Sequence, residues 1–143
     1  MKIVIECEKD NQFEIVIRCN KIDDEVRKII SLFEDKQFII GKLDNRSYQI
    51  KIDNIYYFEV NEDRSFIYCK DKVYETNLRL YELEKQLDEQ LFVRISKSII
   101  LNLNKLDSIR TLLNGRYEAV LINDERLIIT RHYVSSFKEK FGM

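Results

Sequence analysis

The 143-residue sequence contains no proline, no tryptophan, three glycines and a single histidine, His132. Without proline or clustered glycine, no segment has the composition of a flexible linker, and no repeat or low-complexity tract is present. One histidine excludes a histidine-rich metal site and a relay between histidines. The length and the missing linker together predict one compact body.

Long apolar runs are also missing. No stretch approaches the ~18 uncharged apolar residues that a membrane span requires, and the opening "MKIVIECEKDNQ" gains acidic residues before any apolar segment of useful length. We therefore expect no membrane insertion and a cytoplasmic location. Cys7, Cys19 and Cys69 are far apart and lack a close-spaced metal pattern, which predicts buried free thiols and leaves redox chemistry as a weaker alternative.

Enzyme motifs are missing as well. The sequence has no GxGxxG, no GxxxxGK[ST] and no GxSxG. It therefore gives no support for a phosphate-binding loop or for the nucleophile elbow of a hydrolase. The carboxylate pair Asp23-Asp24 is better explained as the start of a helix. We expect no catalytic residue, no metal and no cofactor.

Charge is distributed unevenly along the chain. The net charge is −1, but residues 1–91 hold 15 Lys and Arg against 20 Asp and Glu, a balance of −5. Residues 92–143 hold 9 against 5, a balance of +4. A basic end of this kind favours a contact with an anionic partner there.

The sequence pattern of residues 1–36, the first quarter of the chain, predicts a small β-β-α unit. The segments "KIVIEC" and "FEIVIRC", separated by polar "EKDNQ", have the composition and alternation of a β-hairpin. A helix is expected next, within residues 21–36, because five apolar residues recur there at helical spacing: Ile22, Val26, Ile29, Ile30 and Phe33.

Strand patterns dominate residues 37–143. Short segments rich in Ile, Val, Tyr and Phe alternate with polar turns. One helix interrupts them at residues 78–90, with Thr76 or Asn77 as its cap. A β-meander with a turn at Asn114-Gly115 follows, and the tail is a short helix or an irregular end. The predicted fold is mainly β, and α+β overall.

Two short segments carry groups suited to an anion. "FVRISKS", residues 92–98, places Arg94 and Lys97 beside two serines, directly before an apolar run. Burying an unpaired cation there would cost several kcal/mol, so packing alone does not explain these residues. "TRHYV", residues 130–134, places Arg131 at the end of a strand. Each arginine has a plainer explanation: Arg131 as a solvated charge, and Arg94 as a member of a structural ion pair.

The spacing of these segments resembles that of the LytTR DNA-binding domain family. The resemblance runs from about residue 37 to residue 141 and consists of four blocks in order: "IDNIYYFEV", "VYETNLRLYELEKQL", "LFVRISKSIILNLNKLDSI" and "RYEAVLINDERLIITRHYV". Its most specific residues are Phe92, Arg94, Ile95, Ser98, Asn102, Arg131 and Tyr133. The resemblance implies an elongated, mostly antiparallel β domain over residues 37–143 that contacts DNA through loops.

The resemblance also implies which residues enter a groove of the DNA. Lys97 and Arg131 are the expected base-reading residues, because arginine can hold guanine O6 and N7 together and lysine can reach either acceptor. A third contact is expected in the loop "NEDRS", residues 61–65, from Arg64 or Ser65.

Contacts to phosphate or sugar are expected from Ser96, Ser98 and His132, which would set the register of the protein on the duplex without distinguishing bases. At one position the chain departs from the family pattern. Family members often have histidine where this sequence has Ser96. A serine hydroxyl can still donate a hydrogen bond to phosphate.

These features predict a transcription regulator that binds double-stranded DNA at paired half-sites as a homodimer. Residues 1–36 are the expected dimerisation unit, or a site for an inhibitory or signalling protein partner; alternatively they pack on the β domain of the same chain. The alternative function is a protein-interaction or ligand-sensing β domain whose basic loops bind an acidic partner.

Overall fold

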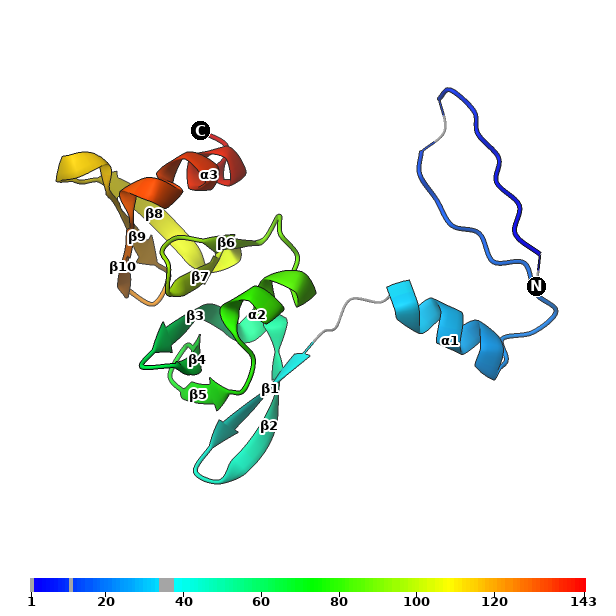
Figure 1. Ribbon diagram of the computed structural model, residues 1–143, viewed down its shortest axis with the longest axis horizontal. Coiled ribbons are helices and arrows are strands. Elements are labelled where there is room, and N and C mark those ends of the chain that lie inside the picture. Colours follow the sequence, from blue (N-terminus) through cyan, green and yellow to red (C-terminus); the bar gives the residue numbers. More distant parts are fainter. Residues whose placement is uncertain (1, 11, 34–37) are drawn as a thin grey trace. The chain divides into compact units, whose positions relative to one another are not determined.

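A computed structural model describes residues 2–10, 12–33 and 38–143 of the chain. The chain divides into two compact units, Met1–Glu34 and Asp35–Met143 (Figure 1). Each unit is compact by itself, and the prediction of one compact body stays a prediction. The domain boundary expected between residues 36 and 37 lies outside the described residues.

The N-terminal unit contains one helix, α1 (Asp24–Phe33). The side-chain Oδ1 of Asp23 accepts a hydrogen bond from the Val26 N–H at 3.0 Å, which satisfies one of the free donors of the first turn. Asp24 and Glu25 lie in that turn, where the helix dipole favours anions. The expected start of the helix at the aspartate pair is confirmed.

The hairpin expected before α1 is not formed. No strand is assigned in residues 2–10 or 12–23; a turn at residues 9–10 lies between two extended segments (Figure 1). Ile3, Ile5 and Phe13 are exposed by 77%, 81% and 96%. A two-stranded hairpin is marginal alone because its apolar face has nothing to cover it.

The expectation of buried thiols is also wrong for two of the three cysteines. Cys7 and Cys19 are exposed, because the extended segments that carry them bury no face. Cys69 is half-buried, and burial raises the pKa of its thiol. All three cysteines are free.

The C-terminal unit begins with a seven-stranded antiparallel sheet in the order β2-β1-β5-β4-β3-β7-β6. This architecture confirms the prediction of a mainly β, antiparallel domain with one helix inserted between strands. The strands are β1 (Phe38–Leu43), β2 (Arg46–Lys51), β3 (Ile55–Asn61), β4 (Arg64–Cys69), β5 (Val73–Thr76), β6 (Phe92–Arg94) and β7 (Ile99–Asn102).

Tight turns join successive strands of this sheet. Asp44 and Asn45 connect β1 to β2, and Glu62 and Asp63 connect β3 to β4; all four residues have positive φ. Two-residue hairpin turns require that conformation, and Asn and Asp tolerate it. Glu62, with φ of 50°, is the strained member, since a long side chain adopts this region at a cost.

The helix between β5 and β6, α2 (Leu80–Gln86), is shorter than predicted and begins after Arg79. Thr76 does not cap it, because this residue ends β5 and its Oγ1 accepts from the Leu78 N–H at 3.3 Å. Leu83 and Leu87 are buried.

A three-stranded meander follows, formed by β8 (Leu106–Thr111), β9 (Tyr117–Leu121) and β10 (Arg126–Ile129). The turn between β8 and β9 confirms the prediction at Asn114-Gly115, where both residues have positive φ. The tail is a helix, α3 (Arg131–Phe141), whose Phe137 is fully buried. No helix in the described part of the chain is long and apolar enough to span a membrane.

Strands β3 and β7 separate two apolar cores. Phe58 and Ile100 face a core beneath α2, whereas Tyr57 and Leu101 face a core shared with the meander and α3. Neighbouring residues of a strand point to opposite faces of the sheet, so a strand buried on both faces is apolar without interruption. This arrangement holds β7 between the two cores, and Ile95 of the loop that precedes it is buried in the second core.

Candidate nucleic-acid interface

Two backbone hydrogen bonds bring the three predicted contact segments together. The Val60 N–H donates to the Ser98 carbonyl at 2.9 Å, which joins the end of β3, just before the turn to β4, to the loop between β6 and β7. The Thr130 N–H donates to the Ile95 carbonyl at 2.9 Å, which joins the start of α3 to the same loop. The loop Ile95–Ser98, hereafter the central loop, therefore lies between the other two segments.

Three of the predicted contact residues have exposed side chains around the central loop. Lys97 is exposed within the loop, and Arg131 and His132 are exposed in the first turn of α3. The resulting surface offers two long cationic side chains and an imidazole from neighbouring segments. Such a surface suits a polyanion, because its cations are exposed on segments that a backbone hydrogen bond joins.

The side chain of Arg131 also lies against the turn between β8 and β9, a contact that the sequence did not reveal. A Cβ atom added to Gly115 would lie 3.3 Å from Cγ and 3.4 Å from Cδ of Arg131. Gly115 thus permits the turn to approach the aliphatic stem of this arginine. The two residues are far apart in sequence, so no local sequence pattern predicts this contact.

Ser96 and Ser98 hydrogen-bond to one another within the central loop. Ser96 is only 9% exposed, and its Oγ accepts from the Ser98 N–H at 3.1 Å. The two hydroxyl oxygens are 3.3 Å apart, and Ser98 is half-buried. In the free chain Ser96 shapes the loop; its contact with DNA stays a prediction, as does that of Ser98.

Arg64 is engaged in an ion pair across β4 and β5. Its Nε and Nη2 donate to the two carboxylate oxygens of Glu75 at 2.9 and 2.6 Å, and its guanidinium lies over the Phe66 ring. The bond from Arg64 lowers the pKa of Glu75, and Glu75 raises the pKa of Arg64. Ser65 is 7% exposed. A DNA contact by either predicted residue of this turn remains a prediction.

Arg94 belongs to a structural network. Its guanidinium donates to Glu84 of α2 and to the backbone carbonyls of Ser96 and Lys97. Of the two explanations that the sequence left open for Arg94, the structural ion pair is correct.

An acidic and aromatic cluster holds the meander against the main sheet. The rings of Tyr57 and Tyr68 stack with their centroids 4.3 Å apart. Burial raises the pKa of Tyr57, and a hydrogen bond to Glu125, in the turn between β9 and β10, raises it further. Burial also raises the pKa of Tyr68, with Glu59 contributing. Because this cluster is acidic, it does not favour a polyanion.

Comparison with known proteins identifies the family. Residues 45–142 match the model of a family described as LytTr DNA-binding domain. The chain belongs to the LytTr DNA-binding domain family. This membership covers the central loop, the start of α3 and the turn between β3 and β4, so all three segments are part of the LytTr domain.

Two curated relatives differ in how much of their length is matched. A sensory transduction protein, LytT, of Enterococcus faecalis is 31% identical over 100 residues, which are 70% of this chain and 41% of that protein. An HTH-type transcriptional regulator of Staphylococcus aureus, described as uncharacterized, is 29% identical over 138 residues, 94% of this chain and 93% of that protein.

A solved structure has the same fold. It is described as the LytTr DNA-binding domain of a methyl-accepting/DNA response regulator from Bacillus cereus, and it aligns with a TM-score of 0.73 and 20% identity over 76% of this chain and 99% of that one. Within residues 38–143, α2 is followed by a strand and α3 is the last element, so this LytTr domain contains no helix-turn-helix.

Proposed function

We propose that the protein is a sequence-specific transcription regulator that enters the major groove of double-stranded DNA with loops of its LytTr domain. The observation that carries this proposal is the convergence of exposed Lys97 and Arg131 around one loop, in a family defined by DNA binding. Loops presented by a rigid sheet are suited to such work, because the scaffold fixes the side chains at little cost in entropy.

Within this surface, Lys97 and Arg131 supply the base contacts. The planar fork of arginine matches the two acceptors on the major-groove edge of guanine, and lysine provides one charged donor. His132 and Ser98 supply phosphate or sugar contacts, which fix the register of the protein on the duplex. Arg64 joins them when DNA competes with Glu75 for its guanidinium.

The protein acts without catalysis and without a cofactor, since recognition by these side chains needs neither. Its action on the bacterial chromosome places it in the cytoplasm.

Residues 1–36 bring two copies together on DNA. The support is exposed apolar surface: Ile22 and Phe33 of the α1 region are exposed by 63% and 61%, and Ile5 by 81%. A second copy that covered these side chains would remove apolar area from water, which stabilises association. Two copies on one face of a duplex require half-site centres roughly 10 or 21 base pairs apart. The same surface suits an inhibitory or signalling partner.

Sedimentation tests the dimer with a matched pair of variants. Phe33→Asp places a charge in the apolar surface, and Ser31→Asp places the same charge at a polar position two residues earlier on α1. We expect a dimer for the natural chain and for Ser31→Asp, and a monomer for Phe33→Asp. A monomeric natural chain at concentrations that saturate DNA would exclude the dimerisation role.

A salt titration separates DNA recognition from binding of an acidic protein. Release of counterions from DNA gives a linear fall of log K with log salt, with a slope of about −0.9 per neutralised phosphate. A selected duplex should also bind at least about 10³-fold more tightly than a random one. Equal affinity for both duplexes would favour the acidic-partner function.

A further inference from the structure

We infer that Arg94 is a positioning residue that holds the central loop in the shape that presents Lys97 to DNA. The inference rests on the proposed function for the role of Lys97, but not for the arrangement of the loop itself. No direct contact between Arg94 and DNA is required.

All three nitrogen groups of the Arg94 guanidinium are in use. Nε donates to the Ser96 carbonyl at 2.9 Å, Nη2 donates to the Lys97 carbonyl, and Nη1 donates to the Glu84 carboxylate. The arginine side chain is only 28% exposed. Because each nitrogen already donates a hydrogen bond and the side chain is only partly exposed, this guanidinium is poorly placed to bind a phosphate.

The two carbonyls belong to consecutive residues of the loop, and this spacing requires an arginine. A guanidinium presents donors in a rigid plane, so it can bond two successive carbonyls and a carboxylate at once, whereas a lysine ammonium is a single point of charge on a flexible stem. Fixing the carbonyl of Lys97 fixes the peptide plane next to its Cα, and therefore the direction in which its exposed side chain leaves the loop.

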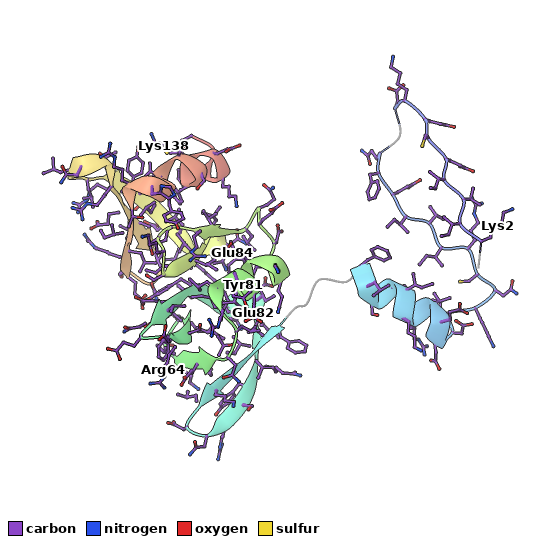
Figure 2. The ribbon with its side chains drawn as sticks, in the orientation of Figure 1. Lys2, Arg64, Tyr81, Glu82, Glu84 and Lys138 are labelled. Carbon is purple, nitrogen blue, oxygen red and sulfur yellow. The ribbon has the colours of Figure 1, made fainter. Side chains whose placement is uncertain are left out.

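The third bond ties the loop to a rigid element. Glu84 lies on α2 (Figure 2), one residue after Leu83, which is fully buried in the core beneath this helix. The base of the loop is closed separately, by the Ile95 N–H donating to the Ile99 carbonyl at 3.0 Å. Arg94 therefore holds the tip of the loop, and the sheet holds its base.

Affinity for a selected duplex tests this role through one variant that keeps the charge, Arg94→Lys, and one that removes it, Arg94→Gln. We expect Arg94→Lys and Arg94→Gln each to weaken binding about tenfold, the equivalent of one hydrogen bond to a charged group, while the salt slope of Arg94→Lys stays that of the natural chain. Arg126→Lys is the matched control, because Arg126 is an exposed arginine paired with Glu118 at 3.3 Å on the meander. Its affinity should be unchanged.

A double-mutant cycle adds a readout that a purely structural role would not move. If Arg94 acts through Lys97, then Lys97→Ala should weaken binding less in the Arg94→Lys background than in the natural chain. Additive losses would overturn the inference. So would natural affinity in Arg94→Lys together with a shallower salt slope in Arg94→Gln, since that result makes Arg94 a phosphate contact.

Amide hydrogen exchange of the full chain without DNA tests the loop directly. In Arg94→Lys we expect faster exchange at the Lys97 and Ser98 amides and unchanged exchange in β7. Unchanged exchange at the loop overturns the inference. If the natural chain distinguishes no duplex, the proposed function fails, and faster loop exchange in Arg94→Lys still supports the positioning of the loop.

Discussion

Asn102 provides a sharp test of whether the most specific motif serves the fold or contacts DNA. It belongs to that motif, and its side chain is buried. It is 1% exposed; its Nδ2 donates to the Ile55 carbonyl at 2.7 Å and its Oδ1 accepts from the Asn104 N–H at 2.9 Å. Asn102→Ala leaves two backbone groups without these partners, each worth about 1–3 kcal/mol when buried. Since Asn104 is exposed and water can replace its bond, we expect a total loss of about 2–3 kcal/mol.

Urea unfolding followed by circular dichroism measures this loss, and Asn104→Ala is the matched control. Asn104 contributes only its backbone to the network and its side chain is exposed, so its removal should change the free energy of unfolding by less than about 0.5 kcal/mol. Base preference should be unaltered in both variants. Natural stability in Asn102→Ala, together with a lost preference at one base, would refute the reasoning and make Asn102 a DNA contact.

Two further variants address the turn between β3 and β4. Glu62→Asn should stabilise the chain by about 0.5–1 kcal/mol, because asparagine tolerates the positive φ at this position, and it should also tighten DNA binding by removing an anion; equal affinity would place the turn away from DNA. Arg64 holds the pKa of Glu75 below its ordinary value of 4.5, so the pair stabilises the folded chain above that pH and loses this contribution as the pH falls through the lowered value. The free energy of unfolding of Arg64→Gln should therefore fall less steeply as the pH is lowered. The same fall as in the natural chain would contradict the pairing.

The C-terminal fold follows from local patterns. Short segments of β-branched and aromatic residues separated by Asp, Asn and Gly turns predict antiparallel strands, and the structure contains them. The same logic fails in the first 20 residues. "KIVIEC" and "FEIVIRC" have the composition of strands, but a strand also needs a surface that covers its apolar face. Pattern alone does not supply that surface.

The sequence names the residues of the candidate site but not the contacts that they make. The sequence names Lys97 and Arg131, and a backbone hydrogen bond from Thr130 to Ile95 joins the two segments that carry them. The partners of Arg64 and Arg94 were not expected, because Glu75 and Glu84 lie 11 and 10 residues away and are brought near only by strand pairing and helix packing. Charge in a sequence does not show which cations are already paired.

Selection of bound duplexes from a random pool, carried out with the natural chain, Lys97→Ala, Arg131→Ala and Arg126→Ala, tests the central claim most directly. The account predicts that the Lys97 and Arg131 variants each lose about 1–3 kcal/mol of affinity for the natural site and relax the preference at one or two base positions. The Arg126 variant should select the natural site. Identical preferences in all four proteins, with only a shallower salt dependence in the variants, would contradict base reading by these loops.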